Sequence, residues 1–221
     1  MTGSRTMRRL VKALATAGLF VGFGLLALKG RLMGAEASEG EEFKPIKEAE
    51  MPKGFPGYTP VGQIEVKRYP AYRKASASGM AEFWTLFQHI KENNVAMTAP
   101  VEMDYGDPRA TKSKERSMSF LYERPDQGAT GRQGSVEVVD VPAMTVVSIG
   151  CRGARTAAAI AEAREKLVKW LDEKKGQYVA SGPMRVMGYN SPFVPRDKNF
   201  FEVQISIKPA TVSSAGAPRK D

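Results

Sequence analysis

Two short stretches of the chain decide the fold, IEVKRYPAYRKASAS at residues 64–78 and VEVVDVPAMTVVSIG at residues 136–150. Aligned 72 residues apart, they are identical at Glu65/Glu137, Val66/Val138, Pro70/Pro142, Ala71/Ala143 and Ser76/Ser148. Their β-branched and aromatic residues favour an extended strand. Proline cannot donate a backbone hydrogen bond to a sheet, so Pro70 and Pro142 each predict a bulge or a bend.

A helix is predicted after each stretch. The first covers MAEFWTLFQHIKENN at residues 80–94, with Ser78 as its cap, and the second covers residues 156–176, with Thr156 as its cap and Gly176 as its end. Apolar residues at helical spacing define the buried faces. These are Phe83, Leu86, Phe87 and Ile90 in the first helix, and Ile160, Ala163, Leu167 and Leu171 in the second.

Two further strand-like segments follow each helix, at residues 94–105 and 117–125 and at residues 178–192 and 200–209. The order therefore predicts an α+β domain at residues 61–209, made of two β-α-β-β repeats, about 61–125 and 135–209. Such units join most naturally about a pseudo-twofold axis, with the helices outside. We expect a crevice at their junction to be the ligand site.

The composition argues against nucleic-acid binding. The chain has 221 residues, 42% hydrophobic and 26% charged, and a net charge of +9. Six of its basic residues lie within residues 1–34, which contain no acid, so the rest of the chain carries only +3. Binding to phosphates needs a dense basic stripe, which the body of the chain lacks.

Residues 1–33 are predicted to be a signal anchor or a signal peptide. A basic head precedes the apolar run at residues 13–28, and Lys29 and Arg31 follow it. These charges favour an uncleaved anchor, and either alternative predicts an exported protein, tethered to the membrane or released as a periplasmic or secreted one. Residues 34–60 are predicted to be a flexible linker and residues 210–221 a disordered tail.

The residue types offer little catalytic chemistry. The chain has one cysteine, Cys151, and one histidine, His89, and it has no nucleotide-binding motif. The segment after each helix is rich in methionine, which adapts to flat ligands and can bind iron, although core packing is the simpler explanation. These methionines are Met97, Met103, Met184 and Met187.

The chain resembles the SOUL/haem-binding protein family over about residues 62–208. The resemblance rests on IEVKRYPAY, on FWTLFQHIKENN leading into MTAPV, and on GYNSPFVP followed by NFFEVQI. It implies a distorted antiparallel β-barrel with two outer helices. It also implies non-catalytic binding of haem or another tetrapyrrole, in an apolar site beside the first helix.

Three hypotheses follow. In the first, the chain is an exported haem- or porphyrin-binding protein that buffers or carries its ligand. Trp84, Phe87, Met97, Met103, Met184 and Met187 would line the porphyrin, Lys91 or Arg185 would meet its propionates, and His89, at the helix flank, would be an optional iron ligand. In the second, the same fold binds another amphipathic molecule or a partner protein. In the third, an enzyme acts through His89 and Cys151. The oligomeric state stays open.

Overall fold

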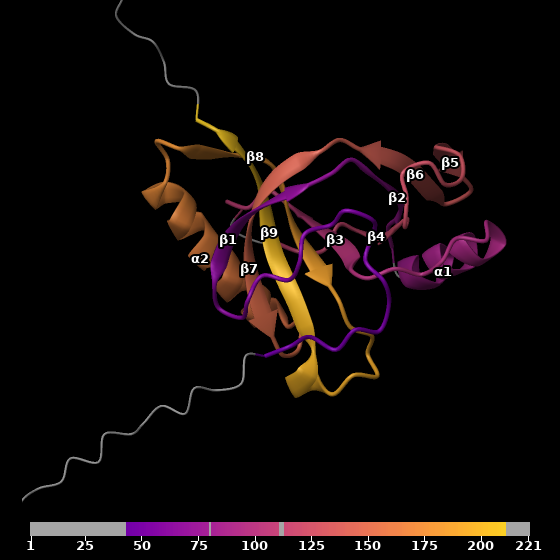
Figure 1. The fold of residues 1–221 in the computed structure, drawn as a ribbon, viewed down its shortest axis with the longest axis horizontal. Helices are drawn as coiled ribbons and strands as arrows, with labels where there is room; N and C mark the ends of the chain where they lie inside the picture. Colours follow the sequence, from indigo (N-terminus) through magenta and orange to yellow (C-terminus); the bar gives the residue numbers. More distant parts are fainter. Residues whose placement is uncertain (1–42, 80, 111–112, 211–221) are drawn as a thin grey trace, which may run out of the picture. The chain divides into compact units, whose positions relative to one another are not determined.

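The computed structural model describes residues 43–79, 81–110 and 113–210 (Figure 1). The predicted leader and almost all of the predicted tail lie outside these ranges. Within them, no helix is both long and apolar enough to cross a membrane. The described residues contain the sheet, both helices and three clusters of buried apolar side chains, so a fragment that begins at residue 43 carries a complete core.

The architecture is α+β, as the sequence predicted, with one sheet of nine strands in the order β1-β7-β9-β8-β3-β4-β2-β6-β5. All of the paired strands are antiparallel. The strands are β1 Ile64–Tyr69, β2 Tyr72–Ala77, β3 Val101–Gly106, β4 Ser117–Leu121, β5 Gly131–Gln133, β6 Val136–Val141, β7 Met144–Arg152, β8 Tyr178–Gly188 and β9 Phe200–Pro209. The helices are α1 Glu82–Glu92, α2 Ala157–Glu173 and the short 3-10 helix Arg196–Lys198.

Each of the two opening stretches forms two strands, because the chain leaves the ladder at its proline. Pro70 separates β1 from β2, and Pro142 separates β6 from β7. The two parts then pair with different neighbours: β1 pairs with β7, whereas β2 pairs with β4 and β6. The order of elements in each half is therefore β-β-α-β-β rather than the predicted β-α-β-β.

The expected barrel is also not formed, since the sheet is open. Within the described residues no ladder joins β1 to β5, the strands at its two ends. The breaks at the prolines explain this difference. They place β1 outside β7 and β6 outside β2, so both segments extend the sheet instead of closing it.

Helix α1 is shorter than predicted and turns a different face to the sheet. It begins after Ala81, whose side chain makes no capping bond, so Ser78 is not its cap. Leu86, His89 and Ile90 are its buried residues, whereas Phe83 and Phe87 are 37% and 42% exposed. The helix contacts β2, β4 and β6.

Helix α2 follows the prediction more closely. Ala159 donates its backbone N–H to the Thr156 hydroxyl at 3.1 Å, which is the expected cap. Its buried residues are the predicted Ile160, Ala163, Leu167 and Leu171. The helix packs on β7, β8 and β9, and together they enclose the largest apolar cluster.

Residues 43–60, here called the strap, run across part of the sheet (Figure 1, indigo). Phe55 packs edge-on against Tyr69 and Tyr72, with centroid distances of 4.8 and 5.3 Å. Tyr58 packs in the same way against Tyr189, with a centroid distance of 4.9 Å. This described part of the predicted linker is therefore packed against the domain.

Candidate functional site

A cleft of about 420 Å³ lies between the two helical parts of the domain, and we call it the interhelix cleft. Its floor includes Met118, which packs against both the α1 and the α2 clusters. Its wall is made by β3, the start of α2 and the loop between β8 and β9. The lining residues are Met103, Tyr105, Glu115, Met118, Ala154, Arg155, Ile160, Asn190, Pro192, Val194, Arg196 and Asn199.

Arg155 supplies a cation inside this cleft. It precedes the cap of α2, and its Nη1 lies 2.7 Å from the Met103 sulfur. The guanidinium can approach this closely because residue 188 is glycine, where an added Cβ would lie 2.7 Å from Nη1. Arg155 remains open to solvent at the mouth of the cleft, but the surrounding protein atoms still lower the pKa of its guanidinium.

Glu115 faces Arg155 in the same cleft. Partial burial, together with Glu82 at the start of α1, raises the pKa of its carboxyl to about 7. Its Oε1 has no hydrogen-bond partner among the described residues. The cleft therefore combines a cation, a carboxyl group that changes charge near neutral pH, and a wall of sulfur and apolar atoms.

Three aromatic side chains lie along α1, and we call them the α1 ridge. None of them lines the cleft, but the ridge begins one residue after Glu82, which neighbours Glu115 of the cleft. Phe83 packs against Phe120 of β4 at 5.3 Å and lies parallel to Phe87 at 6.3 Å. Trp84 contacts both Phe83 and Phe87 edge-on and remains 69% exposed. Exposed clusters of aromatic side chains are typical of binding surfaces. Lys91 is exposed further along the helix.

A family model described as SOUL heme-binding protein matches residues 55–206. The chain belongs to the SOUL heme-binding protein family. The match covers most of the sheet and both helices, and thus includes the interhelix cleft and the α1 ridge. It confirms the family that the sequence motifs indicated.

Comparison with solved structures finds similarity to more distant proteins. The EcmrR chain in an EcmrR–DNA complex is 16% identical, with a TM-score of 0.52, and the match covers 66% of this chain and 57% of that one. The EcmrR C-terminal domain is 17% identical, with a TM-score of 0.49 and coverages of 66% and 97%. A hydrolase from Listeria innocua is 12% identical, with a TM-score of 0.48 and coverages of 68% and 94%. None of the curated proteins matches this chain significantly.

His89, the optional iron ligand of the first hypothesis, is buried in this SOUL protein rather than at a solvent-facing flank. Its Nε2 lies 2.8 Å from the Tyr122 hydroxyl, and its Nδ1 lies 3.3 Å from Asn93 Nδ2. Burial lowers the pKa of the imidazole. A bond to iron through Nε2 would have to replace the contact with Tyr122.

The predicted methionines are dispersed. Met103 lines the cleft, and Met184 is enclosed in the cluster under α2. Met187 lies on the opposite face, in the cluster beneath the strap. Met97 is 38% exposed and does not line the cleft.

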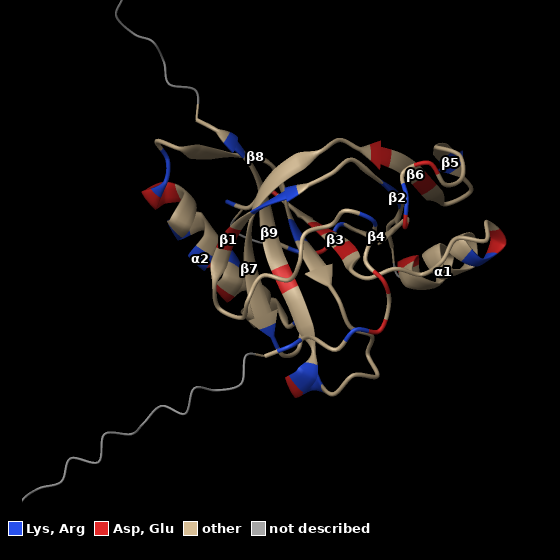
Figure 2. Ribbon diagram, in the orientation of Figure 1, with Lys and Arg blue, Asp and Glu red and all other residues tan. Residues whose placement is uncertain are grey.

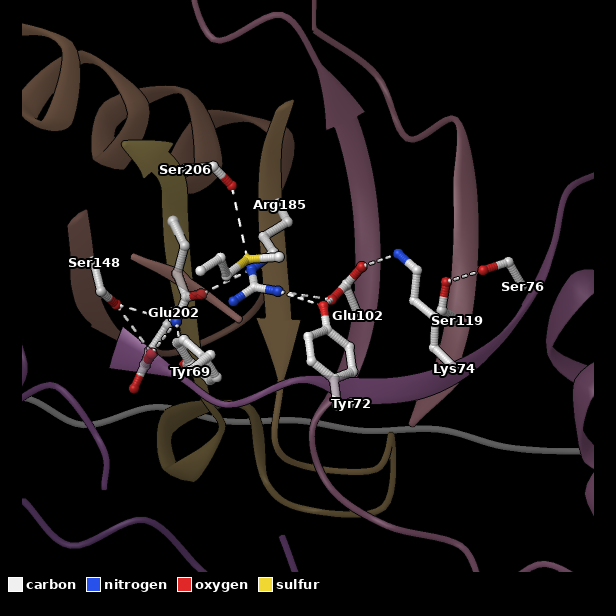
Figure 3. Close-up of polar contacts among 12 residues, drawn as sticks. Tyr69, Tyr72, Lys74, Ser76, Glu102, Ser119, Ser148, Arg185, Glu202 and Ser206 are labelled. Carbon is white, nitrogen blue, oxygen red and sulfur yellow. Dashed lines mark hydrogen bonds and ion pairs between the residues drawn. The ribbon is translucent and has the colours of Figure 1, made fainter. Parts of the chain in front are cut away.

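Arg185 also lies on the strap face, in a network of buried charges (Figure 3). Its Nη1 donates to Glu102 at 3.0 Å and to the Tyr72 hydroxyl at 2.7 Å. Burial alone would raise the pKa of Glu102, but the charges of Arg185 and Lys74 hold it below its ordinary value. Arg185 is thus engaged in the sheet, away from the cleft.

The proposed pair His89 and Cys151 is not brought into contact. The Cys151 thiol lies 3.8 Å from the Ile149 carbonyl and packs at the edge of the α2 cluster. Burial raises the pKa of this thiol to about 12, so it is protonated at neutral pH. The ring nitrogens of His89 have other partners, as described above.

The sequence reasoning missed Arg155 and Glu115. One signal for Arg155 was available, because a cation immediately before a helix is unfavourable next to the positive end of the helix dipole. An arginine at that position is therefore worth examining for another role. Nothing in the sequence pattern singles out Glu115, which lies in a polar loop.

Proposed function

We propose that this chain binds haem or another tetrapyrrole non-covalently in the interhelix cleft, with the α1 ridge as an additional apolar surface, and that it catalyses no reaction. The observation that carries the proposal is the Arg155 guanidinium, held in the cleft against Gly188. Its Nη1 has a thioether sulfur as its partner, which is a weak acceptor. A carboxylate of a bound ligand would be a much stronger partner.

The residues of the cleft fit the chemistry of a tetrapyrrole. Such a ligand has a flat apolar ring and carboxylate side chains, and it supplies an iron centre when it is haem. Met118, Ile160 and Val194 offer an apolar wall, and Arg155 and Arg196 offer cations for carboxylates. The volume of about 420 Å³ lies in the range of small-molecule sites. Trp84 and Phe87 would cover ring atoms that protrude from the cleft.

The cellular role that fits is buffering or carriage of the ligand by an exported, membrane-tethered protein. The export and the tether rest on the sequence of residues 1–33 alone. In this proposal the strap face, with its buried charges, supports the fold and takes no part in ligand binding. Membership of the SOUL family supports a binding role.

A haem titration of residues 43–221, followed by absorbance, tests the proposal. We expect saturable one-to-one binding with a sharp Soret band, and also binding of metal-free porphyrin. Arg155→Met should weaken the binding of both about ten-fold or more, which is the effect of losing a charge-assisted hydrogen bond. Arg132→Met, on the exposed strand β5, is the matched control and should bind as the parent does.

The alternative function is a module of the same fold that binds a different amphipathic molecule or a partner protein. The open cleft and the exposed α1 ridge would serve it equally well. It would be favoured if neither haem nor metal-free porphyrin bound saturably. Equal affinity of the parent and the Arg155→Met variant for both ligands would instead contradict the assignment of the site to Arg155.

A further inference from the structure

The loop between β8 and β9 exposes a phenylalanine at its tip. Phe193 is 94% exposed and lies between Pro192 and Pro195. The loop is held in place by Asn199, whose Nδ2 donates to the Val194 carbonyl at 2.7 Å and to the Pro195 carbonyl at 3.0 Å. A braced loop therefore holds a large apolar side chain out in solvent. Single exposed apolar residues are common on soluble proteins, so Phe193 alone does not indicate a binding surface.

The second observation is the surface around Phe193. The strap begins beside this loop, because Asn190 Nδ2 donates to the Ile46 carbonyl at 2.8 Å and the Ser191 N–H donates to Glu48 at 2.7 Å. Ile46 is itself 40% exposed. The loop and the start of the strap thus place two exposed apolar side chains at one edge of the domain.

Basic side chains surround these two residues. Arg152, at the end of β7, lies 4.9 Å over the Phe43 ring and donates to the Asp197 carbonyl at 2.6 Å. Figure 2 shows Lys and Arg at this edge, around the 3-10 helix and where the described chain begins. The exposed cations are Lys44, Lys47, Arg152, Arg196 and Lys198. The acids here are fewer than the cations: the Glu48 carboxylate is bonded to Ser191, Glu50 pairs with Lys47, and Asp197 lies between Arg196 and Lys198 in the 3-10 helix. We call this set of residues the basic edge.

We propose that the basic edge contacts an anionic lipid bilayer, with Phe193 inserted at the lipid–water interface. Aromatic side chains favour this interface, and exposed Lys and Arg are attracted to anionic headgroups. Residue 43 lies at this edge, and its position also favours a bilayer as the binding partner. Only 14 residues, 29–42, separate it from the apolar run at residues 13–28, and they span at most about 50 Å. This last argument rests on the proposed membrane tether.

The proposal also gives the interhelix cleft an orientation. Asn190, Pro192 and Arg196 belong to the loop beside the basic edge and also line the cleft. A bilayer at this edge would lie next to the mouth of the cleft. An amphipathic ligand could then pass between the bilayer and the cleft without crossing bulk water.

Vesicle sedimentation of residues 43–221, without added haem, tests the contact directly. We expect the fragment to bind phosphatidylserine-containing vesicles more tightly than phosphatidylcholine vesicles. Phe193→Ser should reduce vesicle binding about ten-fold, because the variant lacks the phenylalanine ring that would be buried in the bilayer interface. Val179→Ser, which removes another exposed apolar side chain on β8, is the control and should leave binding unchanged.

Further variants distinguish the contribution of the basic side chains to vesicle binding from the insertion of residue 193. Lys44→Gln with Lys198→Gln should weaken binding to the anionic vesicles, whereas Lys174→Gln with Lys175→Gln, at the end of α2, should have little effect. In Phe193→Trp the added indole fluorescence should shift to the blue when vesicles are present. Equal binding to both vesicle types, or equal loss with Phe193→Ser and Val179→Ser, would overturn the proposal. Self-association that depends on Phe193, without vesicle binding, would assign the edge to a second copy instead.

Because these measurements use no haem, their failure is distinguishable from the failure of the proposed function. Haem binding without vesicle binding would support the proposed function and contradict the membrane contact. Vesicle binding without tetrapyrrole binding would support the membrane contact and contradict the proposed function.

Discussion

Arg185 Nη1 lies 3.0 Å from Glu102 Oε2, with the two side chains meeting diagonally across the β3–β8 ladder at the centre of the sheet. Both side chains are almost completely buried, at 5% and 4% exposure. Lys74 pairs with the other oxygen of Glu102, and the Tyr72 hydroxyl donates to Oε2 at 2.8 Å. One carboxylate therefore balances the buried Arg185 and the partly buried Lys74.

Glu102→Gln should consequently destabilise the domain strongly. The change leaves the buried Arg185 and the partly buried Lys74 without their counter-charge, and breaking a buried pair such as Arg185–Glu102 costs about 3–5 kcal/mol of unfolding free energy. Urea denaturation measures this loss. Asp172→Asn is the control, because its partner Arg109 forms an exposed ion pair worth about 1 kcal/mol or less. Similar losses in the two variants would contradict the assigned role of Glu102.

The strap should contribute measurably to stability. Phe55 packs between Tyr69 and Tyr72 but remains partly exposed, so Phe55→Ala should cost about 2–3 kcal/mol, less than a fully buried phenylalanine. Phe193→Ala, at a side chain that is 94% exposed, should change the unfolding free energy by less than about 0.5 kcal/mol. The two midpoints in urea provide the comparison, and an unchanged midpoint for Phe55→Ala would mean that the strap adds no stability.

The alternation of apolar and polar residues along the strands could be predicted from the sequence, but the segments that cover each face of the sheet could not. In β9, Phe201, Val203 and Ile205 pack under α2, as the pattern of apolar residues indicates. Glu202 and Gln204 alternate with them and would be read as solvent-facing. They are fully buried, because Lys67, Ser148 and the strap cover them. The covering residues that bond to Glu202 are 54 to 143 positions away from it in the sequence. Local periodicity cannot predict such distant partners.

The family was predictable from the sequence, but the residues of the candidate cleft were not. The motifs indicated the SOUL family, and the exposed Trp84 and Phe87 could be proposed from the aromatic composition of α1. The orientation of that helix could not be predicted, because Phe83 and Phe87 have the spacing of a core stripe. In the structure, Leu86 and Ile90 share the buried face with His89, which is bonded to Tyr122, 33 residues away, and Phe83 and Phe87 are partly exposed.

Glu115 should make the stability of the domain depend on pH near neutrality. Its folded pKa is about 7, above the ordinary value of 4.5, because of burial and the neighbouring Glu82. Below about pH 4.5 the carboxyl is protonated in both states, and above pH 7 it is ionised in both. Ionisation is harder in the folded state, so the unfolding free energy should fall as the pH rises from about 4.5 to 7. The loss is at most roughly 3 kcal/mol, and less because solvent screens this half-exposed group.

Glu115→Gln should remove most of this dependence and stabilise the domain at pH 8 relative to the parent. Urea denaturation at pH 5 and pH 8 makes the comparison, with Glu165→Gln on the exposed face of α2 as the control. A parent whose stability is the same at both pH values would refute this assignment. The same variant should also bind haem more tightly at pH 8, since the ionised Glu115 no longer competes for Arg155.

His89→Ala should affect stability more than the haem spectrum. The buried Tyr122 hydroxyl would lose its partner, which costs about 1–3 kcal/mol. The position of the Soret band should stay unchanged, because the ring of His89 is engaged with Tyr122 and Asn93 instead of the cleft. Tyr122→Phe removes the hydroxyl as well and serves as the comparison in stability. A Soret band that shifted in His89→Ala alone would instead identify His89 as the iron ligand.

Gly188→Ala offers a test of the cleft that changes no charge. The new Cβ would lie 2.7 Å from Arg155 Nη1 and 3.0 Å from its Cζ, so the guanidinium would have to move. If Arg155 binds a ligand carboxylate from its present position, the affinity for haem should fall about ten-fold, as in Arg155→Met. Because arginine is flexible, the domain should lose little stability. Gly57→Ala, where an added Cβ meets nothing within 4 Å, is the control. Unchanged affinity in Gly188→Ala together with weakened binding in Arg155→Met would place the carboxylate outside the space against Gly188, at the mouth of the cleft.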